Sequence, residues 1–237
     1  MKSKRLLEQI LSKKKRYLKF KYQEEIYKLG DCLMIQDQGG RYSVAKLLEI
    51  IPRNGIKKHS LWPTIKVQWF YSKADINREK NSLIALKDFN SISDYELFNS
   101  LHTDTIYIET VVCKCFVVHM EEYLKLDEPS DLVYFYRADY DPIKEVLKPP
   151  FEKWNKICKC NTPFNPDQLY LKCDNCMKYF HPTCVGIPEE KGEQMDAFYC
   201  NECISSINPK TDLKENSNIY RNLNPKTTVV ITKDKSH

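Results

Sequence analysis

The chain lacks any apolar run long enough to cross a membrane, since a spanning helix needs about 18 such residues in a row. Its N-terminus carries basic residues but no apolar stretch of the kind found in secretory signals. We therefore expect a protein of the cell interior that has no membrane partner.

Catalytic motifs are also missing. The chain has no glycine-rich phosphate loop, no nucleophile elbow and no motif of a lysine methyltransferase or demethylase. Histidine, the commonest general acid or base, occurs only five times. These absences favour a binding protein over an enzyme.

Cysteine, in contrast, is abundant and clustered. Seven of the ten cysteines fall with one histidine in the pattern C-x-C-x12-C-x2-C-x4-H-x2-C-x15-C-x2-C. Four short ligand pairs suffice for two closed tetrahedral zinc sites, and a closed site is structural because no position is open for water. Without an export signal, metal binding is favoured over disulfides. The predicted ligands of two structural zinc ions are Cys158, Cys160, Cys173, Cys176, His181, Cys184, Cys200 and Cys203.

The segment before this zinc module reads as β structure. Runs of β-branched and aromatic residues alternate with turn residues from Tyr27 to Tyr140, and Pro149-Pro150 then marks a boundary. The remaining cysteines, Cys32, Cys113 and Cys115, are interpreted as small buried hydrophobic residues. The predicted division is a basic N-terminal extension at 1–26, a β domain at 27–148, a linker at 149–155, the zinc module at 156–205 and a polar tail at 206–237.

Charge is distributed unevenly along the chain. Residues 1–28 hold ten Lys and Arg against three acids, and residues 206–237 hold six against three, within a formal net charge of +5. A basic arm of this kind favours nucleic acid or acidic partners. The candidate DNA contacts are Lys13, Lys14, Lys15 and Arg16, and a merely solvated extension is the alternative.

The order of the zinc ligands, four Cys, one His and three Cys, resembles a PHD finger. RING domains place the His one ligand earlier, and Phe198 stands two residues before Cys200, where PHD fingers keep an aromatic residue. The resemblance implies a cross-brace in which alternate ligand pairs share an ion. One zinc would be held by Cys158, Cys160, His181 and Cys184, and the other by Cys173, Cys176, Cys200 and Cys203.

The same resemblance implies a binding site for a histone tail. PHD fingers that read trimethyl-lysine enclose the ammonium group with aromatic side chains through cation–π attraction. The matching positions here are Phe164 and Tyr179, with Tyr170 as an extra wall, while Asp167 and Asp174 would contact the basic peptide. Ile157 departs from an aromatic position. In the alternative interpretation, Tyr170 and Tyr179 are only packing residues of a finger that does not bind methyl-lysine.

The resemblance extends upstream. The segment CKCNTPFNPDQLYLKCDNC is similar to CKCEMPYNPDDLMVQCEGC-type sequences of plant BAH–PHD proteins, and residues 27–148 resemble a BAH domain. The implied methyl-lysine cage consists of Tyr42, Trp69, Tyr71 and Asp88. Trp69 and Tyr71 are two apart on one strand and so face the same side; alternatively, both are simply core residues.

The sequence thus predicts a mostly β protein, in which a barrel-like BAH domain precedes a small cross-brace PHD finger with two zinc ions. The resemblance implies a nuclear chromatin reader that regulates transcription or chromatin state. The finger would bind histone H3 trimethylated at lysine-4, and the BAH domain a second mark such as methylated lysine-27. The expected partners are H3 tails, the nucleosome, DNA through the basic arm, and subunits of a chromatin complex. The alternatives are a scaffold, a DNA-binding subunit without methyl-lysine reading, or a RING-like ubiquitin ligase, against which the position of His181 argues.

Overall fold

The computed structural model describes residues 17–51, 64–76 and 86–207. The predicted DNA-contacting run at 13–16 and the polar tail beyond 207 lie outside the described residues, so the DNA contact stays a prediction. The chain separates into two compact units, and each is described by itself. The first contains residues up to 83 with 95–123 and 129–148; the second contains 84–94, 124–128 and the chain from 149 onward.

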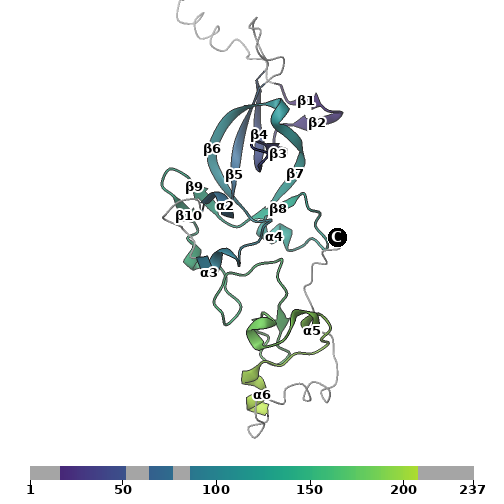
Figure 1. The fold of residues 1–237 in the computed structure, drawn as a ribbon, viewed down its shortest axis with the longest axis vertical. Helices are drawn as coiled ribbons and strands as arrows, with labels where there is room; N and C mark the ends of the chain where they lie inside the picture. Colours follow the sequence, from purple (N-terminus) through teal and green to yellow (C-terminus); the bar gives the residue numbers. More distant parts are fainter. Residues whose placement is uncertain (1–16, 52–63, 77–85, 208–237) are drawn as a thin grey trace, which may run out of the picture. The chain divides into compact units, whose positions relative to one another are not determined.

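The first unit is built on one curled sheet (Figure 1). The strand order is β10-β9-β6-β5-β4-β3-β7-β8, and a separate β1-β2 hairpin accompanies the sheet. The mostly β prediction is therefore confirmed. The strands are β1 (Lys19–Tyr22), β2 (Glu25–Lys28), β3 (Cys32–Gln36), β4 (Tyr42–Ile51), β5 (Thr64–Ser72), β6 (Leu97–Tyr107), β7 (Val111–His119), β8 (Val133–Tyr136), β9 (Asp139–Asp141) and β10 (Val146–Lys148).

The central strands owe their shape to alternation of apolar residues. Ile65 and Val67 of β5 are fully buried, and they pack with Leu33 of β3 and Leu47 of β4 in one core cluster. On β5, the residue between Ile65 and Val67 points to the opposite face, because successive side chains of a strand alternate. Register shifts on both sides of β5 mark bulges, which bend a sheet and turn side chains in a new direction.

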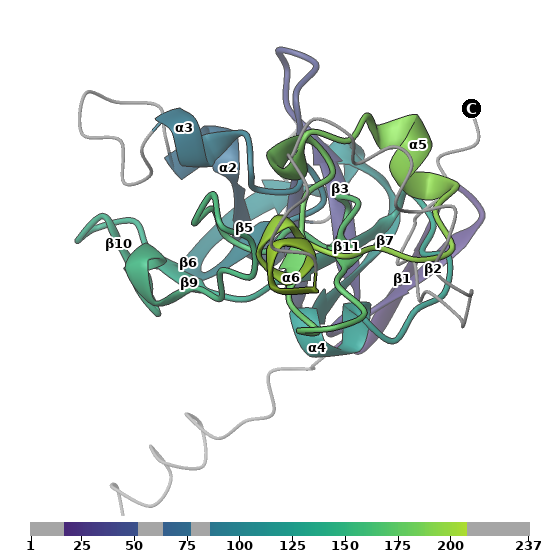
Figure 2. The ribbon, with the colours of Figure 1, turned by 90° about the horizontal axis from the view of Figure 1, so that it is seen from below.

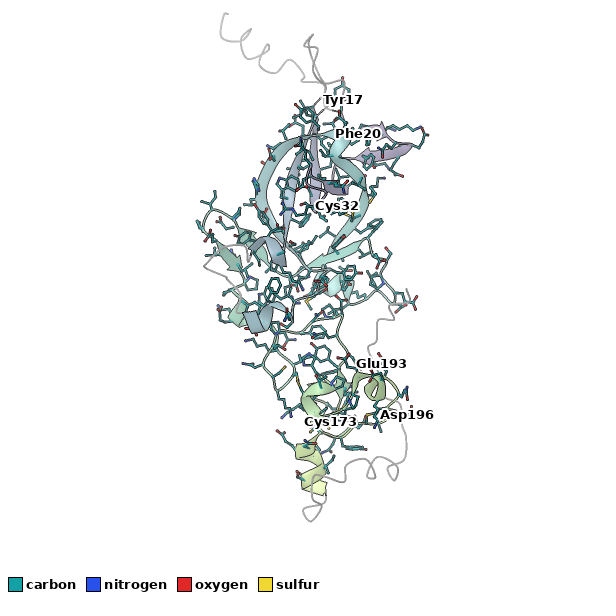
Figure 3. The ribbon with its side chains drawn as sticks, in the orientation of Figure 1. Tyr17, Phe20, Cys32, Cys173, Glu193 and Asp196 are labelled. Atoms are coloured by element: carbon teal, nitrogen blue, oxygen red, sulfur yellow. The ribbon has the colours of Figure 1, made fainter. Side chains whose placement is uncertain are left out.

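Short helices complete the first unit. They are α2 (Lys73–Ile76), the 3-10 helix η1 (Ile108–Thr110) and α4 (Met120–Tyr123). Seen from below, α2 lies beside β5, the strand it directly follows (Figure 2). Tyr17 and Phe20, labelled in Figure 3, pack against the core cluster from the N-terminal side.

A buried ion pair fixes the start of β6. Arg137 donates to both carboxylate oxygens of Glu96, from Nε at 2.5 Å and from Nη2 at 2.6 Å. The backbone of Glu96 also bridges Phe135 on β8. The pair therefore ties β6 to the segment that joins β8 and β9.

The second unit has little regular structure. It contains α3 (Leu86–Phe89), η2 (Phe151–Lys153), the hairpin β11 (Leu171–Lys172) and β12 (Tyr179–Phe180), η3 (Thr183–Val185), α5 (Glu189–Glu193) and α6 (Asn201–Ile207). Its core combines four buried cysteines with Leu171, Phe180 and Phe198. Across the described ranges of both units, helices are too short and too polar to span a membrane.

Candidate functional site

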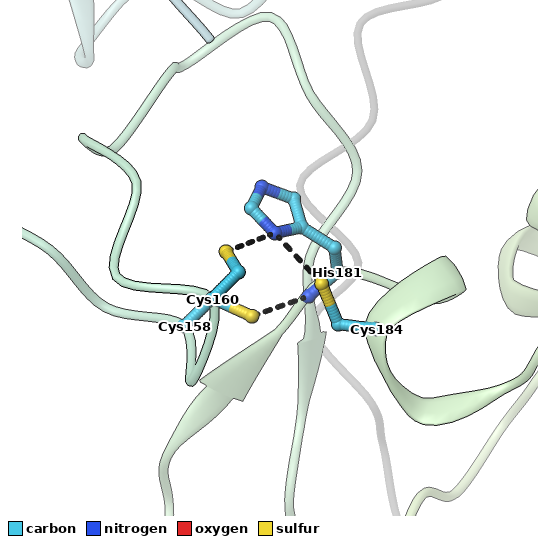
Figure 4. Close-up of side chains that lie close together, drawn as sticks. All are labelled: Cys158, Cys160, His181 and Cys184. Carbon is cyan, nitrogen blue, oxygen red and sulfur yellow. Dashed lines mark hydrogen bonds between the residues drawn. The ribbon is translucent and has the colours of Figure 1, made fainter. Parts of the chain in front are cut away.

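The eight predicted zinc ligands form two separate groups within the second unit. In each group the donor atoms all lie within 4.8 Å of one another. Thiolate sulfur and imidazole nitrogen in fours are the donors that structural Zn²⁺ takes in tetrahedral sites. The residues therefore suit two zinc ions, as expected. One group is Cys158, Cys160, His181 and Cys184 (Figure 4), and the other is Cys173, Cys176, Cys200 and Cys203.

Tight turns bring each leading ligand pair together. The N–H of Asn161 donates to the carbonyl of Cys158 at 3.0 Å, and that of Met177 donates to the carbonyl of Cys173 at 2.8 Å. Asn161 and Met177 both adopt a φ of 61°. This left-handed backbone reverses the chain just after the pair, which is why two nearby side chains can reach one ion.

His181 is oriented by its neighbours. Its Nδ1 lies 3.4 Å from Sγ of Cys160 and 3.7 Å from Sγ of Cys184, so Nδ1 is the nitrogen that faces the ligands (Figure 4). Its Nε2 lies 3.0 Å from Oε1 of Gln168. A neutral imidazole that binds metal through Nδ1 carries its proton on Nε2, so Gln168 accepts that N–H and fixes the ring. Gln168 was not predicted from the sequence.

Backbone N–H groups surround one thiol of the second zinc group, that of Cys173. The N–H of Cys200 points at Sγ of Cys173 at 3.3 Å. Burial opposes ionisation of Cys173, but backbone N–H groups, led by that of Cys176, outweigh it and lower the pKa of Cys173 to about 7. A thiol that loses its proton this easily is a ready metal ligand.

The predicted histone-binding aromatics of the finger occupy two layers. The ring centres of Phe164 and Tyr170 lie 5.3 Å apart, and the Tyr170 ring also packs against the His181 ring in a tilted arrangement, with the centres 4.5 Å apart. Tyr170 is only 4% exposed, and its hydroxyl accepts the N–H of Asn165. Tyr179 is half-buried on β12, where Nζ of Lys172 stands 6.0 Å from its ring centre. Phe164 and Tyr179 are thus the more accessible rings, while Tyr170 belongs to the inner layer.

The two predicted acids of the finger hold its own loops. Asp174 accepts the N–H of Phe198 at 2.9 Å. Asp167 accepts the hydroxyl of Ser93, from the 84–94 segment of the same unit. Asp167 also lines a cavity of about 440 Å³ together with Glu189, Glu193 and three ligands of the first zinc group, Cys160, His181 and Cys184. The acidic lining suits a basic peptide, and the histone contact of these acids stays a prediction.

The first unit carries a different cavity, of about 330 Å³. Trp69 and Tyr71 both line it, so the two aromatic side chains predicted to share a face do meet in one pocket. The complete lining consists of Ile35, Asp37, Arg41, Ser43, Trp69, Phe70, Tyr71, Asp75 and His102.

The other two residues of the predicted cage, Tyr42 and Asp88, are not among these lining residues. Tyr42 is 56% exposed at the start of β4 and does not belong to the cavity lining. Asp88 lies on α3 in the second compact unit, where its carbonyl accepts the N–H and hydroxyl of Ser91. Their part in a cage remains a prediction.

Two acids line the cavity with the aromatics, Asp37 and Asp75, and Asp75 lies on α2. Its Oδ2 accepts the backbone N–H of Ser72 at 3.0 Å and the Ser72 hydroxyl at 2.7 Å, while the N–H of Asp75 points back at the Ser72 hydroxyl. This reciprocal arrangement is a capping box, so the S-x-x-D spacing directly after the aromatic strand is the sequence signal that could have found it.

Polar contacts orient the phenol of Tyr71. Its hydroxyl lies 2.8 Å from Nδ1 of His102, and its ring meets that of Tyr140 edge-on at 5.0 Å. Burial, with the charge of Asp75 as a smaller cause, raises the pKa of Tyr71. The phenol is therefore neutral at physiological pH, and Tyr71 presents a ring face with no charge of its own.

Family models and known proteins match the chain along both the β domain and the zinc module. The BAH domain model matches residues 25–150, and the PHD-finger model matches residues 157–203. The chromatin remodeling protein SHL of Arabidopsis thaliana is 30% identical over 224 residues, which cover 92% of this chain and 91% of SHL. The chromatin remodeling protein EBS of the same plant is 30% identical over 198 residues, covering 82% of this chain and 76% of EBS.

Similarity to an enzyme is confined to a short segment. The histone lysine demethylase PHF8 of Danio rerio is 33% identical over 52 residues, which are 22% of this chain and only 5% of that protein. The match falls on the finger alone, whereas SHL and EBS match along both domains. The chain thus belongs to the BAH–PHD proteins, with a BAH domain followed by a PHD finger that provides two groups of zinc ligands.

Proposed function

We propose that this protein is a nuclear chromatin adaptor without catalytic activity, which binds methylated histone H3 tails through two sites. The observation that carries the proposal is the cavity in which Trp69 and Tyr71 stand together with Asp75. The similarity to SHL and EBS, which are named chromatin remodeling proteins, supports a role in chromatin.

The chemistry of the BAH cavity suits a methylated ammonium group. Trp and Tyr rings attract a cation over their faces, most strongly when water is excluded. The lining adds two carboxylates, Asp37 and Asp75, against the single guanidinium of Arg41. A volume of about 330 Å³ accommodates the end of a lysine side chain. We assign to this site the second mark, trimethylated lysine-27 of H3.

The finger would bind trimethylated lysine-4 of H3 against Phe164 and Tyr179. Acidic groups at Asp167, Glu189 and Glu193 would attract the basic tail by complementary charge. Two weak sites in one chain gain affinity for a nucleosome because the second contact forms at a high effective concentration. Partners beyond H3 tails, such as DNA or complex subunits, belong to the same proposal.

Replacing Trp69 by Ala is expected to weaken binding of an H3 peptide trimethylated at lysine-27 by at least tenfold, because the better of the two ring faces is lost. Isothermal titration calorimetry with the zinc-loaded chain measures the change. Phe116→Ala is the matched control, since Phe116 is an exposed aromatic residue of the same sheet outside the cavity lining. Equal binding by both variants would contradict the assignment, as would equal affinity of the unvaried protein for methylated and unmodified peptide.

Replacing Tyr179 by Ala is expected to reduce binding of the peptide trimethylated at lysine-4 by about three- to tenfold, the range expected for a partly exposed ring. Tyr179→Trp should restore or exceed the original affinity because Trp provides the stronger ring face. Tyr107→Ala removes an exposed tyrosine of the BAH domain and serves as control. If the lysine-4 peptide binds Tyr179→Ala as well as the unvaried protein, the finger does not read methyl-lysine with this residue.

A further inference from the structure

The carboxylate of Asp75 is already engaged on both of its oxygens. The capping bonds from Ser72 end on Oδ2. Oδ1 lies 3.5 Å from Nη1 of Arg41. The acid in the aromatic cavity is thus held in place by the helix start and neutralised by a cation of the chain itself.

Arg41 is held in this position from a second side. Its Nε lies 3.5 Å from Oδ2 of Asp37, and its backbone N–H donates to Oδ1 of the same carboxylate at 2.9 Å. Asp37, Arg41 and Asp75 all line the cavity. The guanidinium therefore stands between two carboxylates next to the aromatic rings, with 49% of its side chain still exposed.

The degree of methylation decides what an ammonium group requires from such a site. Monomethyl- and dimethyl-lysine keep N–H bonds that need an acceptor when they are buried, and a free carboxylate is the strongest acceptor a protein can offer. Trimethyl-lysine has no N–H and is held by ring faces and overall charge alone. A carboxylate that is already paired with a guanidinium is a poor acceptor for the N–H bonds of mono- and dimethyl-lysine. Binding of trimethyl-lysine does not depend on such an acceptor, because this group has no N–H to donate.

We propose that Arg41, through its ion pair with Asp75, makes the BAH cavity select trimethyl-lysine over mono- and dimethyl-lysine. Arg41 is a specificity-determining residue in this role, and the inference rests on the proposed function of the cavity. Repulsion between the guanidinium and an incoming ammonium acts on every methylation state alike. The ratio of the affinities for two methylation states therefore measures the contribution of the hydrogen bonds to binding, without the repulsion between charges.

The test is calorimetric titration of the full zinc-loaded chain with four H3 peptides centred on lysine-27, from unmethylated to trimethylated. Arg41→Gln should raise the affinity for the monomethyl peptide about tenfold relative to the trimethyl peptide, the usual effect of gaining one charge-assisted hydrogen bond. Arg41→Lys, which keeps the charge beside Asp75, should leave the ratio close to that of the unvaried protein. Lys46→Gln removes the same charge from an exposed site on β4 outside the cavity and should not change the ratio.

A double variant, Arg41→Gln with Asp75→Asn, separates the ion pair from other effects. It should lose the gain for the monomethyl peptide because the Asp75 carboxylate is gone. A gain that persists would point to Asp37, which Arg41→Gln also releases in the same cavity, and would contradict the role of the Arg41–Asp75 pair. A ratio that stays unchanged in Arg41→Gln overturns the inference, and so does an equal shift in Lys46→Gln. If none of the methylated peptides binds the unvaried chain or any variant more tightly than the unmethylated peptide, it is the proposed function of the cavity that fails.

Discussion

Removal of zinc is expected to unfold the PHD finger and leave the BAH domain folded. Four of the eight buried residues in the finger core are cysteine ligands, and the other four are Tyr170, Leu171, Phe180 and Phe198. Zinc binding contributes roughly 10–16 kcal/mol to the folding of such small metal modules at neutral pH. No comparable metal group occurs among the described residues of the BAH domain, whose core is aliphatic and aromatic. The two domains should therefore separate in their response to chelation.

Two-dimensional NMR of the intact chain, recorded before and after treatment with a strong chelator, measures this effect. Signals of the finger should collapse to the narrow range of unfolded chains, and those of the BAH domain should stay dispersed. Cys203→Ser should reproduce the collapse at the second zinc group and reduce the bound zinc in metal analysis. Cys113→Ser, at a half-buried cysteine outside both groups, is the matched control and should keep both ions. A zinc-free finger with native dispersion would show that the apolar contacts alone hold it.

The sequence is informative where chemistry and spacing are local. The zinc groups could be predicted because each short ligand pair lies on a single turn and the donor type names the metal. Strand alternation predicts Trp69 and Tyr71 on one face, and both line the cavity, but the bulge between Gln68 and Phe70 interrupts the alternation and Phe70 lines the cavity as well. The assignment of the four ligand pairs to two ions does depend on how distant segments approach one another, and that part follows from the resemblance to PHD fingers.

The same reasoning does not give contacts between side chains that are distant in the sequence or that depend on how elements pack. Asp75 lines the aromatic cavity because α2 begins immediately after β5 and its cap holds the carboxylate there, and the sequence reasoning did not single it out. Asp174 and Asp167 hold partners that the spacing of the zinc ligands does not reveal, one of them Ser93, 74 residues away. Tyr170, expected as a wall of the histone site, also packs its ring against that of His181, a contact that the ligand spacing does not reveal. Burial of this kind follows from tertiary packing, which a single sequence encodes only indirectly.

The buried pair of Glu96 and Arg137 belongs to this second class, since its members are 41 residues apart. Glu96 is fully buried and Arg137 is 8% exposed, with two short bonds between them. Such a pair need not add net stability, because the loss of water from both charges offsets their attraction. Removing one partner is a different matter, since it leaves the other charge buried and uncompensated.

Arg137→Met is therefore expected to lower the free energy of unfolding of the BAH domain by about 3–5 kcal/mol, measured by urea denaturation of the zinc-loaded chain. Replacing Glu96 by Leu in the same chain should recover much of this loss, because no buried charge then remains. Lys144→Met is the control: its pair with Asp141 spans 3.8 Å with the lysine 75% exposed, and exposed pairs contribute about 0–1 kcal/mol. If Arg137→Met is no more destabilising than Lys144→Met, the pair does not hold β6 against the β8–β9 segment. If the double variant is as unstable as Arg137→Met, the loss comes from packing around the guanidinium and not from the unpaired carboxylate.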